Sequence, residues 1–311
     1  MNLNTEYSKF VRFYQDNGYV LIPAADSDGY SFIIDNMFKR YSALVSNVDN
    51  AKRNKIKVAF RDANNNPRHI IDILRDKNSL ASSLITNNFL RHTIFEFLHT
   101  NKRYYISHSK LSYKTFNNDA SWCPHQDNGY KLFSEKDGFA IFICLEDMDS
   151  RNGALQLYTC SHRLGRLHHQ RVVQSSFGDG QYIIPNKLLP DKSTLVTIDA
   201  KKGDIVIFHP NCIHQSGQTF SSSRRLALIF EVEEYSPLVT DDYGKTPIML
   251  QGELTLLETN LTLLLSFFSI DRLWIRLSDY PFIKRLIRSI IIYPFNIINT
   301  KICSIYSSLF Q

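Results

Sequence analysis

The sequence predicts a mainly β protein with flanking helices (α+β), and three observations support this fold class. The middle of the chain, about residues 103–235, carries short runs rich in β-branched and aromatic residues. Turn-forming Gly, Asn, Asp and Pro separate these runs. The chain shows no βαβ alternation and no glycine-rich phosphate loop, which argues against a nucleotide-binding fold. Short strands at this spacing are typical of a β-sandwich or a β-barrel.

Helices are expected mainly before this β core. Residues 5–16 are predicted to be helical and to lead into an apolar strand at 18–23. Residues 30–46 and 80–99 carry apolar side chains at helical spacing. The expected strands of the core then follow in chain order at 104–113, 138–145, 153–160, 193–200, 204–210 and 224–233. We place a boundary between one domain at 1–248 and an apolar, basic, helical appendage at 249–311.

Composition narrows the class of protein. The 311 residues are 43% hydrophobic and 21% charged, with a net charge of +6, as in an ordinary globular protein. Basic residues form no long stripe and no nucleic-acid-binding motif is present, so we expect no nucleic-acid partner. The five cysteines are scattered without a C-x-x-C pair, and the N-terminus lacks the apolar run of a secretion signal. These features predict a cytoplasmic protein.

Three residues form a candidate metal site. His125 and Asp127 flank Gln126, and in an extended segment residues two apart point to the same face. An H-x-D triplet alone is weak, because a loop histidine beside a capping aspartate is common. Support comes from His214, which follows the strand at 204–210 and can complete a two-histidine, one-carboxylate face. Such a face leaves coordination positions open and suits non-haem iron(II), a chelating co-substrate and dioxygen.

A fixed arginine accompanies this set. Arg225 begins the strand at 224–233, eleven residues after His214. A guanidinium there can hold a distal carboxylate through two parallel hydrogen bonds. The sequence therefore contains the parts needed to bind iron together with a dicarboxylate.

These motifs resemble the phytanoyl-CoA dioxygenase-like family of iron(II)- and 2-oxoglutarate-dependent oxygenases. The matching segments are HQD at 125–127, FICLEDMDSRNGALQLYTCSH at 142–162, GDIVIFHPNCIHQSG at 203–217, and Arg225. The resemblance covers about the first three-quarters of the chain. One departure is Thr159-Cys160, where the family often has Pro-Gly before Ser-His.

The resemblance implies a double-stranded β-helix with the metal at one mouth. It implies Fe(II) as metal, 2-oxoglutarate as co-substrate and O2 as oxidant, with Arg225 and Ser216 holding the far carboxylate of 2-oxoglutarate. Arg225 matches the family's arginine better than its neighbour Arg224. Asp127 favours hydroxylation, since halogenases of this architecture have a small residue at that position.

A cluster of basic residues is the first indication of the substrate. Arg163, Arg166 and His168 belong to an acid-free stretch at 161–171, which is either a solvated loop or a rim that attracts an anionic substrate.

The C-terminal segment is the second indication. Residues 280–293 combine an apolar helical face with Lys284, Arg285 and Arg288, which suits the surface of an anionic membrane. The alternative is a helix that packs on the enzyme, or on a sister subunit of a homo-oligomer.

Together these features suggest an oxygenase acting on an anionic, lipid-linked substrate at the cytoplasmic face of the membrane. One candidate resembles the hydroxylases of Kdo, the sugar acid of lipopolysaccharide. A fatty-acyl substrate, a small soluble metabolite, or a non-catalytic β-helix protein that binds metal or sugar are the alternatives.

Overall fold

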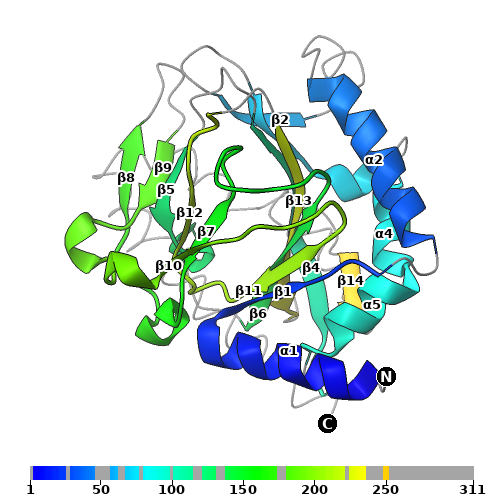
Figure 1. The fold of residues 1–311 in the computed structure, drawn as a ribbon, viewed down its shortest axis with the longest axis horizontal. Coiled ribbons are helices and arrows are strands. Elements are labelled where there is room, and N and C mark those ends of the chain that lie inside the picture. The colour runs from blue at the N-terminus through cyan, green and yellow to red at the C-terminus, as the bar shows by residue number, and fades with distance from the viewer. Residues whose placement is uncertain are drawn as a thin grey trace, which may run out of the picture.

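The computed structural model describes residues 3–25, 29–45, 57–61, 67–76, 80–98, 101–114, 121–130, 137–173, 180–220, 224–235 and 248–251. Within these residues the strands form two facing antiparallel sheets and a separate hairpin (Figure 1). This arrangement is that of a double-stranded β-helix, so the predicted fold class is confirmed.

The larger sheet has eight strands in the order β1-β11-β6-β13-β4-β3-β2, with β14 also paired to β4. Their bounds are β1 Tyr19–Ile22, β2 Lys57–Arg61, β3 Pro67–Ile71, β4 Tyr104–Lys114, β6 Gly138–Cys144, β11 Ile205–Phe208, β13 Arg225–Glu234 and β14 Ile248–Gln251. The long pairing of β13 with β4 runs from Arg225 opposite Lys114 to Glu234 opposite Tyr104, with an irregularity after Glu231.

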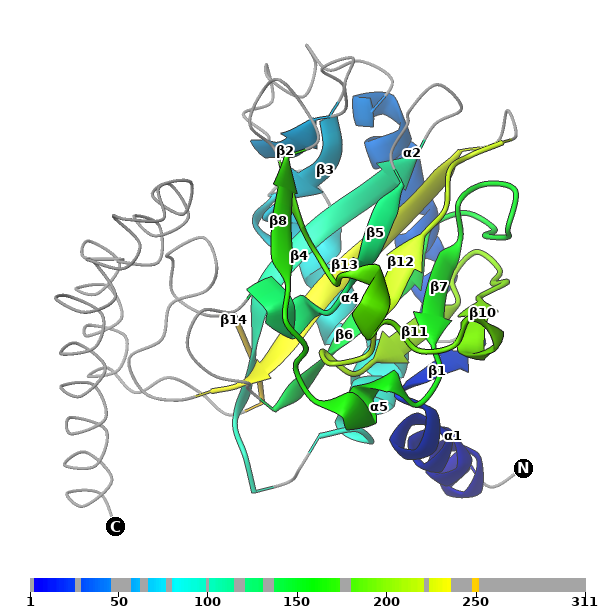
Figure 2. The same ribbon diagram turned by 90° about the vertical axis from the view of Figure 1, so that its left-hand side faces the viewer.

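The smaller sheet has four strands in the order β10-β7-β12-β5. Their bounds are β5 Trp122–His125, β7 Leu155–Tyr158, β10 Leu195–Thr197 and β12 His214–Ser216, and β8 Gln170–Val173 pairs with β9 Gly180–Ile183 as a hairpin. Figure 2 shows the smaller sheet in front of the larger one, with β5 and β12 lying over β4 and β13.

Helices cover the outer face of the larger sheet. Figure 1 shows α2, α4 and α5 together on the side of that sheet away from β5, β7 and β12. The helix bounds are α1 Leu3–Asn17, α2 Tyr30–Val45, α4 Ala81–Thr86 and α5 Asn88–Phe95. Side chains such as Met37 of α2, Leu84 of α4 and Phe230 of β13 share one buried cluster. This layer is the main hydrophobic core.

Alternation along β13 separates the two faces of the larger sheet. Leu226, Leu228 and Phe230 enter the helix-covered core. Ala227 and Ile229 belong instead to the cluster between the sheets, together with residues such as Phe142, Leu157 and Phe208. Because side chains of a strand alternate between faces, residues in step with Ala227 point toward the smaller sheet.

Most predicted elements are present, with local differences. The helix expected at 80–99 is divided into α4 and α5, because the Asn87 side chain accepts a hydrogen bond from the Leu90 amide (3.2 Å) and starts a new helix. Strands β2 and β3 were not predicted. Cys160 lies where the family often has Gly, and its backbone adopts the left-handed conformation (φ 62°) that favours glycine.

The C-terminal appendage is largely outside the described residues. Lys284, Arg285 and Arg288 lie outside them, and the boundary at 248/249 stays a prediction. The described strand β14 reaches Gln251 and is paired with β4. No helix among the described residues is long and apolar enough to cross a membrane.

Candidate metal centre

Two histidines meet because their strands are neighbours in the smaller sheet. His214 of β12 is paired with His125 of β5 on one side and with Leu157 of β7 on the other. Leu157 points into the layer between the sheets, so both imidazoles point there too. Their ring centroids are 4.1 Å apart, and the His214 ring lies 4.8 Å from the ring of Phe208 in the larger sheet. The strand pairing therefore determines the position of both rings.

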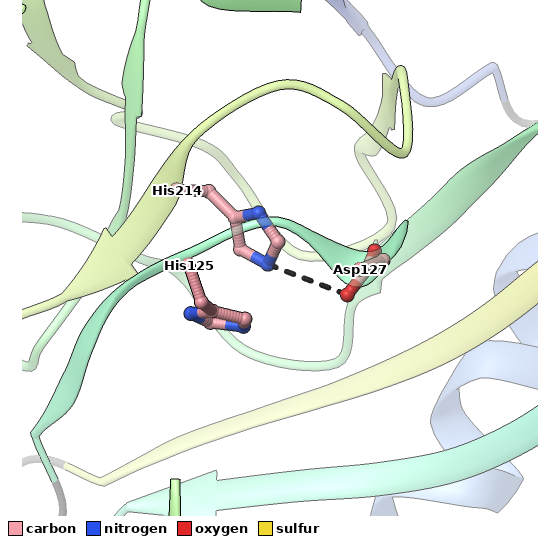
Figure 3. Close-up of side chains that lie close together, drawn as sticks. All are labelled: His125, Asp127 and His214. Atoms are coloured by element: carbon pink, nitrogen blue, oxygen red, sulfur yellow. Dashed lines mark ion pairs between the residues drawn. The ribbon is translucent and has the colours of Figure 1, made fainter. Parts of the chain in front are cut away.

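Asp127 also lies near the two histidines, but its position is not set by strand alternation as we expected. Strand β5 ends at His125, and Asp127 begins the short 3₁₀ helix η2, Asp127–Tyr130. The alternation of an extended strand therefore does not position Asp127; a turn at Gln126 does. Its Oδ1 is 3.7 Å from His214 Nε2 (Figure 3). Ligand atoms of all three buried residues lie within 4.8 Å of one another.

Backbone carbonyls orient both rings. His125 Nδ1 donates to the Cys123 carbonyl (2.7 Å), and His214 Nδ1 donates to the Cys212 carbonyl (3.1 Å). A carbonyl only accepts, so the proton of each neutral ring is on Nδ1 and the lone pair is on Nε2. This arrangement is typical of metal-ligating histidines.

Burial keeps both rings neutral. It lowers the pKa of His125 to about 3, with a further contribution from His214, and lowers the pKa of His214 to about 4. A neutral imidazole is the form that binds a metal ion. The three side chains thus offer two nitrogen lone pairs and a carboxylate in a buried site.

Gln126 holds the turn between the two halves of the HQD motif. Its side chain is fully buried, and its Nε2 donates to the carbonyls of Gly165 (2.8 Å) and Asn211 (2.7 Å). Its Oε1 accepts from the Leu167 amide (2.8 Å). One side chain therefore joins the turn to two other loops.

His169 supports the same turn. Its Nε2 accepts from the Gln126 amide (3.0 Å), while its Nδ1 donates to the Leu167 carbonyl (2.9 Å). The sequence places His169 in a basic stretch and gives no sign of this role. Only the fold brings residue 169 to residue 126.

Arg225 is buried on the inner face of the larger sheet. Its guanidinium donates to the Gly153 carbonyl and to Ser112 Oγ, both at 2.9 Å, and its buried Nε has no hydrogen-bond partner. Burial lowers its pKa to about 10. Among the described residues no carboxylate forms an ion pair with it, so Arg225 can accept an anionic ligand.

Arg224 has a different environment. It donates to Glu146 Oε1 and to Ser42 Oγ, both at 2.9 Å, on the helix-covered side of the sheet. Its charge is therefore already paired within the protein. Of the adjacent arginines, Arg225 is the one directed between the sheets.

Ser216 lies on the same strand as His214, two residues further on. It is buried, and its register partner is Leu155, which points into the layer between the sheets. Beside it, the buried Lys114 donates a hydrogen bond to the Gly217 carbonyl. We did not predict a role for Lys114. Its position as the last residue of β4 is the sequence feature that could have indicated it.

Comparison with known proteins agrees with this geometry. Residues 14–227 match the model of the family described as phytanoyl-CoA dioxygenase (PhyH). The chain belongs to the phytanoyl-CoA dioxygenase family. The resemblance stated from the motifs is thereby confirmed.

Relatives within this family share a limited region with the chain. Phytanoyl-CoA dioxygenase 1 of Oryza sativa subsp. japonica is 30% identical over 109 residues, which cover 35% of this chain and 37% of the relative. Phytanoyl-CoA dioxygenase of Arabidopsis thaliana is 31% identical over 111 residues, covering 36% and 38%. The aligned region thus spans under two-fifths of each relative.

Solved structures share the fold at low identity. The epimerase SnoN, in complex with Fe3+, α-ketoglutarate and nogalamycin RO, is 14% identical with a TM-score of 0.57, covering 81% of this chain and 96% of SnoN. EctD from S. alaskensis, with 2-oxoglutarate and 5-hydroxyectoine, is 16% identical with a TM-score of 0.53, covering 73% and 75%. These similarities support the double-stranded β-helix.

The basic residues predicted to attract the substrate lie on the surface of the protein. Arg163 is exposed and lies 3.5 Å from Asp16 of α1, and Arg166 and His168 are exposed as well. The loop that carries them contacts the HQD turn, since Leu167 and His169 hydrogen-bond to Gln126. The role of these basic residues in substrate binding stays a prediction.

Changing Gly129 to Ala is expected to loosen the HQD turn. A Cβ at Gly129 would lie 2.4 Å from His169 Nε2, so the ring that accepts from the Gln126 amide must move. We expect the free energy of unfolding to fall by about 1–3 kcal/mol, as for other overpacked sites. Urea denaturation measures it. Gly217→Ala is the matched control, because a Cβ there meets nothing within 4 Å; equal loss in both variants would contradict the prediction.

Proposed function

We propose that this protein is an iron(II)- and 2-oxoglutarate-dependent oxygenase that hydroxylates an anionic substrate. The observation that carries the proposal is the convergence of His125, Asp127 and His214 within 4.8 Å in a buried site. Membership of the phytanoyl-CoA dioxygenase family supports it. So do the Fe3+ and α-ketoglutarate named with SnoN and the 2-oxoglutarate named with EctD.

The chemistry of the three side chains fits iron(II). Two neutral imidazoles and one carboxylate form a face that leaves positions open for a chelating co-substrate and dioxygen. When bound, iron(II) would use dioxygen, together with oxidative decarboxylation of 2-oxoglutarate, to supply an oxidant able to hydroxylate a C–H bond. The protein residues hold the ligand atoms in place: the carbonyls of Cys123 and Cys212 keep both rings in the required tautomer.

Arg225 and Ser216 would hold the far carboxylate of 2-oxoglutarate. Arg225 is already fixed by Gly153 and Ser112, so little side-chain entropy is lost when a ligand binds. A buried guanidinium that has no carboxylate partner in the protein can form strong, charge-assisted hydrogen bonds with an anionic ligand. Ser216 adds a hydroxyl on the strand that carries His214.

For the substrate we propose an anionic, lipid-linked molecule such as Kdo of lipopolysaccharide. The exposed basic residues Arg163, Arg166 and His168 support an anionic substrate, because the guanidinium groups of arginine bind carboxylates and phosphates well. The composition of 280–293 supports attachment to an anionic membrane surface on the cytoplasmic side. These two features are independent of the metal site.

Asp127→Ala should weaken iron binding and abolish turnover. It removes the only carboxylate of the three residues, so the loss should exceed the roughly 10–100-fold seen on changing a residue that only supports a ligand. Anaerobic equilibrium dialysis with Fe(II) measures the affinity, and substrate-independent release of carbon dioxide from 2-oxoglutarate measures turnover. Asp191→Ala, at an exposed cap, is the control. Unimpaired turnover in His214→Ala would sink the proposal.

Arg225→Lys should raise the apparent KM for 2-oxoglutarate. Lysine keeps the charge but loses the planar pair of donors. Loss of a charged hydrogen bond corresponds to about a 10–100-fold weaker interaction. The same assay at varied 2-oxoglutarate concentration tests this. Arg224→Lys is the matched control, since Arg224 pairs with Glu146; the reverse order would show that the other arginine binds 2-oxoglutarate.

Replacing Lys284, Arg285 and Arg288 by Ser should weaken binding to anionic vesicles. Each basic residue near such a surface contributes about 1 kcal/mol, so three together correspond to about a hundredfold in partitioning. Sedimentation of the full chain with phosphatidylserine-containing vesicles measures this, and added salt should have a similar effect.

The control for the vesicle experiment removes the same charge elsewhere. Lys187, Lys192 and Lys201 are exposed on the described surface and can be changed to Ser together. Vesicle binding that is salt-insensitive, or lost equally in both triple variants, would contradict membrane attachment through the C-terminal segment.

A further inference from the structure

A pocket opens on the side of the molecule where both sheets end. Strand β1 is the edge of the larger sheet and β10 is the edge of the smaller one. The pocket has a volume of about 470 Å³ and is lined by α1, β1 and residues 197–199 at the end of β10. Figure 2 shows α1 beside β1, with β10 on the same side of the molecule. The metal ligand His125 belongs to β5, at the opposite edge of the smaller sheet, so the pocket is separate from the metal centre.

Most of the pocket lining is apolar. Tyr19 of β1 and Ile198 belong to the cluster between the sheets, and Leu21 packs against that cluster. Phe10 and Phe13 of α1 complete this part of the lining. The Phe13 ring lies edge-on to the Tyr19 ring, with centroids 5.7 Å apart. The hydrophobic layer between the sheets is therefore reached from the surface at this point.

Phe13 leaves part of this lining in contact with water. The exposed fraction of its side chain is 44%. A single exposed apolar side chain is common on protein surfaces. Phe13, however, adjoins a pocket that other aromatic and aliphatic side chains line. An exposed ring beside an apolar hollow indicates a surface suited to contact with another molecule.

Opposite charges lie on two walls of the pocket. Lys9 belongs to α1, Asp199 follows β10, and both are exposed. Within the part of the chain that the structure describes, neither side chain takes part in an ion pair or a hydrogen bond. Each can therefore meet an opposite charge on another molecule.

Both ends of the helix that forms one wall are held to the rest of the protein. Near its start, the Tyr7 hydroxyl lies 3.1 Å from the Thr93 hydroxyl of α5. At its end, the Asn17 carbonyl accepts from the Cys160 amide (2.8 Å). The residues of α1 that line the pocket lie between these two contacts, so this wall is in place before anything binds. Little ordering entropy is then lost on binding.

We propose that this surface is a contact between two copies of the chain related by a two-fold axis. In such a contact the same surface serves both partners, so the two contacts of a residue pair are equivalent. Lys9 of each copy would pair with Asp199 of its partner, and the exposed ring of Phe13 would be buried against the partner's apolar lining. A small apolar ligand would leave both charges without a partner, whereas a second copy offers one for each. The inference is independent of the proposed oxygenase function.

The oligomeric state of the full chain tests the proposal. Sedimentation equilibrium at micromolar concentrations is expected to give twice the mass of one chain. Phe13→Ser should weaken self-association about tenfold or more, because a buried aromatic ring is lost at two equivalent places. Phe32→Ser is the matched control: this ring lies on α2, is 66% exposed, and should have no effect on association.

Charge reversal tests the pairing of Lys9 with Asp199. Lys9→Glu and Asp199→Lys should each weaken self-association at least about tenfold, since like charges then face each other in both equivalent contacts. An equimolar mixture of the two variants should associate again, because each contact then joins an acidic and a basic side chain. Circular dichroism verifies that each variant is folded, as expected for exposed positions.

Three results would overturn the inference. They are a wild-type protein that stays monomeric, association that Phe13→Ser weakens no more than Phe32→Ser does, and charge-reversed variants that associate no better mixed than alone. A monomeric wild type that binds the apolar dye Nile red, with binding lost in Phe13→Ser, would assign the pocket to a small apolar ligand instead.

Discussion

The packing of two sheets against each other is the constraint on which the rest of the molecule depends. The layer between them contains apolar side chains such as Phe142, Leu157 and Phe208. This filling sets the separation of the sheets, as in other face-to-face packings. The same layer holds polar groups from both sheets directly beside these apolar side chains: the Phe208 ring lies 4.8 Å from the His214 ring, and the Arg225 guanidinium lies 5.5 Å from the centre of the Phe142 ring. One layer thus serves both as core and as candidate binding site.

The two sheets contribute different groups to that layer. The smaller sheet supplies His125 and His214, whose rings are oriented by the backbone carbonyls of Cys123 and Cys212, and also Ser216. The larger sheet supplies Arg225 and the buried Lys114, which lie opposite each other on β13 and β4. The two histidines and these two cations therefore come from different sheets.

Sequence reasoning predicted the residues whose signal is local. His125, Asp127, His214 and Arg225 were chosen from short motifs, and the structure brings the first three together. The turn at Gln126 was not foreseen, because alternation was assumed to continue past the end of β5. The coarse fold was also predictable from strand spacing.

Residues whose role depends on non-local pairing were missed. Lys114 lies opposite Arg225, 111 positions along the chain, only through the register of β4 with β13. His169 reaches Gln126 through two loops. Strands β2 and β3 were missed for the same reason, since a short strand is stabilised by its neighbours more than by its own composition.

The pairing of His214 with His125 has a consequence for how the chain folds. Side chains alternate along a strand, so a slip of one residue between β12 and its neighbours would turn His214 to the outside of the smaller sheet. A misaligned chain could keep most backbone hydrogen bonds and still lack a metal site. Capacity to bind metal therefore reports whether a molecule has reached the correct strand alignment, which secondary-structure content alone does not reveal.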